Sequence, residues 1–372
     1  MSGLVKKIWE DGRLLVGGVI QGANDLFNMT GLNNFLSRVA ATTQSIIGHT
    51  TPTNLSVLHD NTVIKAPESQ DLSKSPTASQ FLNAANACYT VSGTPEGMKP
   101  FLVDGKQLAV TDLGSAMSAK VWLTDKNQVI VAFQGTTGGD NIVLNPLVAL
   151  TGVASDVQVW NQTVSQAQKD ALSFTHYVVD VAQKSGIDTD NIFLTGHSLG
   201  GIEASYVGQQ TGLGGMSFES TGIPDAAARV GDGKNFVSVV THGDPVGNYA
   251  SDTEKDSPFV TAMEPGADNA FNHYGKVVMV GAPEDSVKLK AKLDDWNASS
   301  FKNIVSLIDV VPDFIKFHLP GTQAADMGIK LSPHSILADA IFTAHGPVLP
   351  IGDNNLSQII APSTHQNSVF AA

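Results

Sequence analysis

The sequence predicts an α/β fold with a mostly parallel central sheet and helices on both of its faces. Three observations support this class. Short runs rich in Val, Ile and Phe recur along the chain, and segments with helical spacing of apolar residues separate them. One such run, at 192–195, leads through a glycine-rich turn into a stretch of helical character. In an open sheet of this kind, functional residues collect at the carboxyl ends of the strands.

The amino-acid composition argues against several classes of function and structure. The 372 residues include 35 acidic and 22 basic side chains, so the formal charge is −13. That balance argues against nucleic acid or an anionic membrane as the main partner. One cysteine excludes an intramolecular disulfide framework, and no Cys or His cluster has zinc-site spacing. No apolar stretch is long enough to predict a transmembrane segment.

The first part of the chain is predicted to be separate from the sheet. Apolar residues at helical spacing over 1–50, followed by a Pro-, Ser- and Thr-rich connection, predict a helical N-terminal extension and linker over 1–75. This extension either packs on the body or binds a lipid surface or partner. The remaining residues, 76–372, are predicted to form one enlarged domain.

Within that domain the pattern alternates between strand and helix. Helices are expected at 79–89 and 162–184, and 285–345 is mostly helical in character. The expected strands are 120–123, 128–133, 192–195, 216–219, 236–240 and 277–280.

The turn after 192–195 carries the chemistry. It reads Gly196-His197-Ser198-Leu199-Gly200, which is G-x-S-x-G between a strand and a helix. Such a turn is so sharp that bulk two residues before or after the serine would collide with neighbouring backbone. It exposes the serine hydroxyl and aims the first amides of the next helix at an oxyanion. Ser198 is therefore the predicted nucleophile of an α/β-hydrolase fold.

A serine nucleophile needs a histidine base and a carboxylate that orients it, and on this fold the acid precedes the base in the chain. Asp244 follows the strand at 236–240 and is the favoured acid. Asp225, after the preceding strand, is the alternative.

The base is chosen among the histidines that follow Asp244. His334 is favoured because it lies in a loop that opens a helix, and His345 stays open. His273 falls at the amino end of a strand, the wrong edge for catalysis. His318 follows an apolar run, which favours a packing role, and His365 lies in a polar C-terminal stretch without a structural signal.

These residues resemble the class 3 lipases, the family of filamentous-fungal triacylglycerol lipases and their bacterial relatives. Four segments match in order over about 78–345: 130–137, 196–201, 221–224 and 243–246. The paired cysteines of the fungal enzymes are absent, which favours a bacterial relative.

The resemblance implies further parts of the site. Thr136 and the N–H of Leu199 would form the oxyanion hole, and Gln134 replaces the arginine usual in the family. Residues 138–152 would form an apolar lid between glycine hinges, although an ordinary buried helix also fits that pattern. A helical insertion near 285–330 and the N-terminal extension are additions to the smaller fungal enzymes.

The expected function is hydrolysis of lipid carboxylic esters, such as triacylglycerols or partial glycerides, through an acyl-enzyme on Ser198. A phospholipase A1, an esterase or polyester hydrolase, and more remotely a non-catalytic binding protein are the alternatives. No metal or organic cofactor is required, and the oligomeric state is open. Secretion is favoured over a cytoplasmic location by family habit and low charge, although Glu10, Asp11 and Arg13 interrupt any N-terminal signal.

Overall fold

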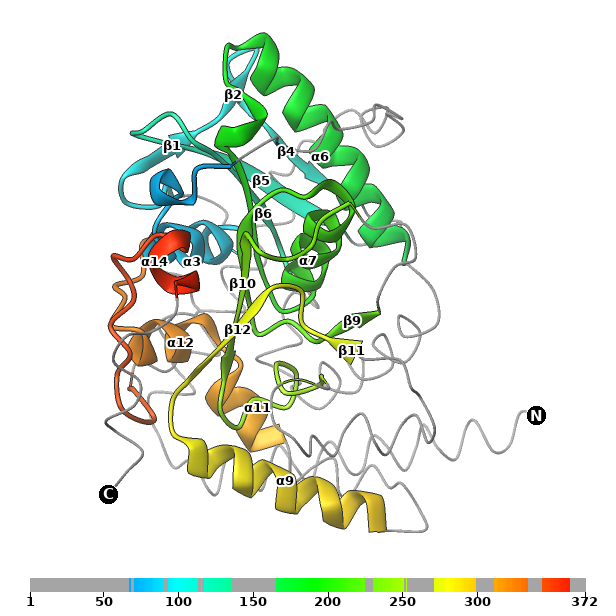
Figure 1. Cartoon of the computed structure of the whole chain (residues 1–372), viewed down its shortest axis with the longest axis vertical. Coiled ribbons are helices and arrows are strands. Elements are labelled where there is room, and N and C mark those ends of the chain that lie inside the picture. The colour runs from blue at the N-terminus through cyan, green and yellow to red at the C-terminus, as the bar shows by residue number, and fades with distance from the viewer. Residues whose placement is uncertain are drawn as a thin grey trace, which may run out of the picture.

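Figure 1 shows a computed structural model of the chain, which describes residues 67, 70–89, 93–112, 115, 117–135, 165–224, 230–250, 252, 271–298, 311–333 and 343–361. The expected lid at 138–152 and nearly all of the expected extension at 1–75 lie outside these residues. Among the helices of the described ranges, none is both long and apolar enough to cross a bilayer.

An eight-stranded sheet forms the centre of the described structure, in the order β1-β5-β6-β7-β8-β10-β12 with β4 also paired to β5. Strands β6, β7, β8, β10 and β12 are parallel, whereas β5 is antiparallel to β6, and β1 and β4 are antiparallel to β5. The strands are β1 (Met98–Pro100), β4 (Ala109–Thr111), β5 (Ser118–Thr124), β6 (Val129–Phe133), β7 (Ile192–His197), β8 (Gly215–Phe218), β10 (Phe236–Thr241) and β12 (Lys276–Val280).

Helices cover both faces of this sheet (Figure 1). On one face lie α6 (Gln166–Lys184) and α7 (Leu199–Thr211), and on the other lie α3 (Ala78–Ala87), α12 (Pro320–Asp326) and α14 (Leu356–Ile360). The mostly parallel sheet with helices on both faces is thus confirmed. The remaining elements are η2 (Leu72–Lys74), η3 (Thr189–Asn191), α9 (Pro283–Ala298), α11 (Val311–Phe317) and two short ribbons, β2 (Leu102–Val103) with β3 (Lys106–Gln107) and β9 (Ile223–Pro224) with β11 (Phe271–Asn272).

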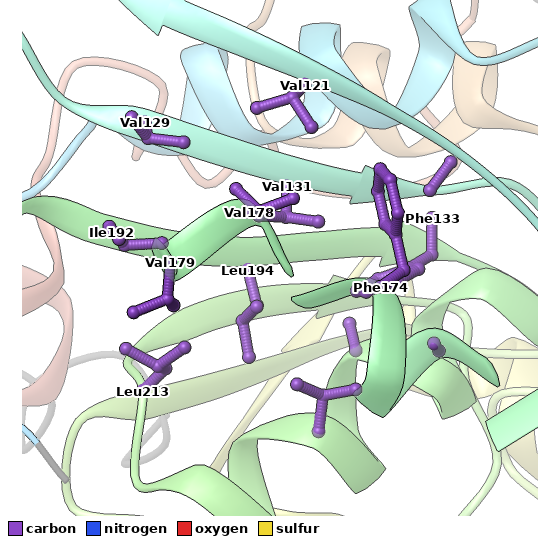
Figure 2. Close-up of a cluster of buried hydrophobic side chains, with 14 of the residues drawn as sticks. Val121, Val129, Val131, Phe133, Phe174, Val178, Val179, Ile192, Leu194 and Leu213 are labelled. Atoms are coloured by element: carbon purple, nitrogen blue, oxygen red, sulfur yellow. The ribbon is translucent and has the colours of Figure 1, made fainter. Parts of the chain in front are cut away.

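The continuous apolar sequence of the central strands follows from burial on both faces. Val131 and Phe133 of β6 pack with Phe174 and Val178 of α6 in one cluster, which Figure 2 shows in close-up. Ala132, between them, belongs with Ile130 to the cluster on the opposite face. Because successive side chains of a strand alternate between faces, a strand covered on both sides needs apolar residues at every position. Burial of each such side chain contributes about 1.5–3 kcal/mol.

Capping boxes set where two helices begin. Thr77 accepts a hydrogen bond from the Gln80 N–H and donates its own N–H to the Gln80 side chain, which starts α3. Ser165 and Gln168 do the same at α6, so that helix begins at Gln166 rather than near 162. Reciprocal bonds of this type satisfy amides that have no partner inside the helix.

The end of the described chain folds back on its start. The N–H groups of Ala78 and Ser79 donate to the carbonyls of Asn354 and Gly352, and the Leu356 N–H donates to Ser75 Oγ. In Figure 1, α14 accordingly lies beside α3.

Candidate active site

Ser198 occupies the tight turn between β7 and α7. Its φ of 59° and ψ of −126° are strained for a residue with a side chain. Glycine is required on both sides of it. A Cβ at Gly196 would lie 2.1 Å from the Gly200 carbonyl oxygen, and a Cβ at Gly200 would lie 2.3 Å from the carbonyl oxygen of Phe133. The structure therefore has the strand, turn and helix that the G-x-S-x-G motif predicts.

The first turn of α7 begins directly after Ser198. Leu199 is the first residue of this helix, and the N–H groups of a first helical turn have no acceptor within the helix. They also form the positive end of the helix dipole. Leu199, one expected oxyanion donor, is thus at the positive end of α7, whereas Thr136, the other expected donor, lies outside the described residues.

The imidazole beside Ser198 belongs to His318. Its Nε2 lies 2.8 Å from Ser198 Oγ, and its Nδ1 lies 3.0 Å from Asp244 Oδ2. Ser198, His318 and Asp244 are 3%, 1% and 0% exposed, respectively. The structure therefore brings together the predicted Ser198 and Asp244, but a histidine that the sequence analysis assigned to packing joins them. His334, the predicted base, lies outside the described residues.

Packing is also what holds His318 in place. It follows α11 directly, and its N–H donates to the Phe314 carbonyl at 3.0 Å. The Phe314 ring stacks on the imidazole, with ring centroids 4.5 Å apart and an interplanar angle of 23°. The apolar run that suggested a core position thus orients the ring toward Ser198. His318 is therefore both buried in the packing of α11 and hydrogen-bonded to Ser198.

Asp244 lies in the turn after β10 and is a well-bonded carboxylate. Its Oδ2 accepts the Gly247 N–H at 2.8 Å, and its Oδ1 accepts the Val246 N–H at 3.2 Å. Burial acts to raise the pKa of Asp244, but the charge of His318 and the hydrogen bonds it receives hold that pKa below the usual value. A carboxylate accepts, so His318 Nδ1 carries the hydrogen and its Nε2 lone pair faces the Ser198 hydroxyl.

A second histidine supports the first from behind. His197 Nε2 donates to the backbone carbonyl of His318 at 2.7 Å, because a carbonyl can only accept. Its Nδ1 then accepts the hydroxyl hydrogen of Tyr89 at 2.9 Å, and the Gly135 N–H donates to the same Tyr89 oxygen at 3.2 Å. Burial, followed by the charge of His318, lowers the pKa of His197 to about 3. This neutral ring links the segment before Thr136 to the backbone of His318.

The other histidines considered in the sequence have different partners. His273 Nδ1 lies 2.8 Å from Asp252 Oδ1, and its Nε2 donates to the carbonyl of Ser220 at 2.9 Å, so it is bound away from Ser198. His345 contacts the ring of Phe317 edge-on. Asp225 and His365 lie outside the described residues.

Glu219 is a buried carboxyl that the sequence analysis did not single out. It follows β8 with a φ of 47° and is fully buried. Its Oε1 accepts both the N–H and the hydroxyl of Thr241, at 3.0 and 2.5 Å. An acidic residue directly after a buried strand, beside the strand that Asp244 follows, was the signal available in the sequence.

Glu219, Asp244 and His318 are the one group of three potential metal ligands within the described ranges, with one atom from each inside 4.8 Å of the others. The imidazole has no lone pair for a cation there, since Nδ1 donates to Asp244 and Nε2 faces Ser198. The arrangement instead suits proton transfer. Hydrogen bonds connect the Ser198 hydroxyl to the His318 ring and that ring to the Asp244 carboxylate. The ring nitrogen can take the hydroxyl proton, and the carboxylate stabilises the resulting cation.

Comparison with known proteins gives limited matches. No family model and no curated protein matches the chain. Among solved structures, a triacylglycerol lipase from Penicillium expansum is similar at a TM-score of 0.37 and 16% identity, covering 56% of this chain and 79% of that one. The extracellular lipase LipA from Serratia marcescens is similar at 0.29 and 16%, covering 40% of this chain and 28% of that one. The fold class rests on the sheet topology and the turn at Ser198 described above.

Proposed function

We propose that this chain is a serine hydrolase that cleaves lipid carboxylic esters through an acyl-enzyme on Ser198. One observation carries the proposal. The Ser198 hydroxyl, on a strained turn at the start of α7, is hydrogen-bonded to an imidazole whose other nitrogen is bonded to a buried aspartate. That constellation activates a hydroxyl for attack on an acyl carbon.

In this mechanism His318, rather than the expected His334, is the general base. Ser198 Oγ attacks the ester carbonyl while its proton passes to His318 Nε2, and Asp244 stabilises the imidazolium that forms. The Leu199 N–H donates to the oxyanion, together with Thr136 as expected from the sequence; each such donor typically contributes about 3–4 kcal/mol. His318 then protonates the leaving alkoxide, and water releases the acid from Ser198.

The substrate class is argued from the whole chain. A formal charge of −13 repels anionic phospholipids, so uncharged glycerides fit better than a phospholipase A1 substrate. Esterase or polyester hydrolase activity is the other alternative. The lid expected at 138–152 remains a prediction from sequence, and it implies a jump in rate once the substrate exceeds its solubility limit. A secreted location also remains a prediction, which cell fractionation tests.

The direct test replaces the nucleophile. Ser198→Ala should lose turnover of p-nitrophenyl esters by several orders of magnitude and should no longer react with a fluorophosphonate probe. Ser185→Ala, an exposed serine at the end of α6, is the matched control and should behave as wild type. Unchanged turnover in Ser198→Ala would refute the assignment. If the wild-type protein neither reacted with the fluorophosphonate probe nor hydrolysed the esters, the non-catalytic binding protein would be favoured instead.

A substrate panel then separates the ester classes. Triacylglycerols, monoacylglycerols, the anionic phospholipid phosphatidylglycerol, short-chain esters and a polyester should be compared with Ser198→Ala as background. We expect the highest kcat/KM on the glycerides. Faster release of fatty acid from the phospholipid would support the phospholipase A1 alternative instead.

A further inference from the structure

Two carboxyl groups lie together behind His318. Glu219 follows β8 and Asp244 follows β10, and these neighbouring parallel strands pair Phe218 with Val239. A Cβ on Gly247 would lie 2.3 Å from Glu219 Oε2 and 3.0 Å from Asp244 Oδ2. Both oxygens therefore face the small space that glycine leaves open.

The hydrogen bonds of the two groups differ. Asp244 accepts from two backbone N–H groups and from His318 Nδ1. Glu219 Oε1 accepts twice from Thr241, but no hydrogen-bond donor of the described residues reaches its Oε2. The bare oxygen therefore faces the carboxylate that already has three donors.

Glu219 and Asp244 are both fully buried, so two ionised carboxylates here would repel each other with little screening by solvent. The pair therefore holds one proton. Asp244, with its three donors, is the better anion. The proton then belongs on Glu219 Oε2, because this oxygen has no other hydrogen-bond partner among the described residues and can donate the proton to Asp244. In agreement with this geometry, burial and the charge of Asp244 raise the pKa of Glu219 well above its usual value.

We propose that Glu219 is a neutral carboxylic acid that donates a hydrogen bond to the Asp244 carboxylate and thereby positions the acid of the catalytic triad. Its protonation follows from the fold alone, whereas its effect on turnover rests on the proposed ester hydrolase function. The added donor restrains rotation of the Asp244 carboxylate and keeps its charge directed at His318. Glu219 acts through Asp244 and not on the reacting atoms, so it is a positioning residue.

Within the described ranges, three histidines are the titratable groups bonded to this pair or to the backbone beside it. His318 bonds Asp244 directly, and His197 bonds the His318 carbonyl. His273 bonds the carbonyl of Ser220, the residue after Glu219.

Two substitutions separate a neutral Glu219 from an ionised one. In Glu219→Gln, the amide oxygen can accept from Thr241 and the amide N–H can donate to Asp244. This variant should retain wild-type kcat, KM and pH profile. In Glu219→Met, the shape is similar but the donor and acceptor are gone, so kcat should fall at least about tenfold with little change in KM. If Glu219 were ionised, Glu219→Gln would remove a negative charge near His318 and move the acid limb of the kcat profile to lower pH, which would overturn the proposal.

Infrared spectroscopy tests the proton without any substrate. The spectrum of wild type minus that of Glu219→Gln, at about pH 7, should contain the C=O band of one protonated carboxylic acid. A carboxylate band there would refute the neutral acid even if the protein hydrolysed no ester. If the acid band is present but Glu219→Met keeps full kcat, the positioning role is refuted. Should Glu219→Met not fold, the Glu219→Gln pH profile and the infrared band still decide the protonation state.

Discussion

His318 and His273 look alike until their Nε2 atoms are compared. Both imidazoles are buried, and each has an aspartate on Nδ1, at 3.0 Å for Asp244 and 2.8 Å for Asp252. Nε2 of His318 lies 2.8 Å from a serine hydroxyl, whereas Nε2 of His273 lies 2.9 Å from the carbonyl of Ser220. A hydroxyl can donate a proton, but a carbonyl can only accept one.

The comparison shows that burial and an aspartate partner do not by themselves place a histidine beside a hydroxyl. His273 faces acceptors with both nitrogens, so it fastens the loop after β8 to Asp252. His318 directs a lone pair at Ser198. The aspartates differ as well, since the Asp244 side chain is 0% exposed and that of Asp252 is 26% exposed. The interaction energy between a carboxylate and an imidazolium is larger where water is excluded.

Removal of the two rings should separate these roles most strongly. His318→Ala should lower kcat for ester hydrolysis on the order of 10⁵-fold, because Ser198 loses its proton acceptor. His273→Ala should keep kcat close to wild type and lower the melting temperature, since it breaks two buried hydrogen bonds. Steady-state kinetics and thermal denaturation of both variants check this. Comparable loss of kcat in His273→Ala, with its structure intact, would remove the distinction.

Neutralising the two aspartates should give the next largest contrast. Asp244→Asn should reduce kcat by about 10³- to 10⁴-fold, because an amide no longer enforces the Nδ1–H tautomer or stabilises the imidazolium. The matched Asp252→Asn variant should retain nearly full kcat. Near-wild-type activity in Asp244→Asn would mean that another carboxyl orients the base, and the double variant with Glu219→Gln would then identify Glu219 as that group.

A smaller effect is expected at His197, which donates to the backbone carbonyl of His318 and lies beside its ring, with ring centroids 5.0 Å apart. His197→Gln should lower kcat by about 10- to 100-fold through misplacement of the base. His176→Gln, on α6 of the opposite face, is the control. An unchanged kcat in His197→Gln would show that α11 and Phe314 alone hold His318.

The same residue predicts a pH dependence of stability. Because the pKa of His197 is about 3 in the fold, against about 6.5 in an unfolded chain, only the unfolded chain binds a proton there as the pH falls below about 6.5. The free energy of unfolding should therefore fall toward acid by up to about 1.4 kcal/mol per pH unit from this group. Urea denaturation at several pH values should show a shallower dependence in His197→Gln.

Local signals in the sequence predicted much of this molecule. The alternation of strands and helices, the glycines around Ser198 and the position of Asp244 after a strand all depend on neighbours in the chain. His318 could not be found in this way, because its role depends on α11 packing against the site from far along the sequence. The run ending in Phe317 indicates burial correctly, and only the tertiary structure shows what the buried ring faces. Glu219 was missed for a similar reason, since its partner comes from the next strand.

The packing of α14 beside α3 has a consequence for synthesis. The cluster under α6 and α7 draws on residues from Phe101 to Tyr274, whereas α3 packs with Leu356 and Ile359. Asn83 and Asn86 of α3 also bond the carbonyls of Lys330 and Pro333, each 247 residues away. A ribosome therefore releases α3 long before its partners exist, and contacts of such separation form slowly. We expect the face of the sheet under α6 and α7 to be covered first during translation. The face that holds Phe81 and Leu82 should stay exposed to chaperones until α14 has been synthesised.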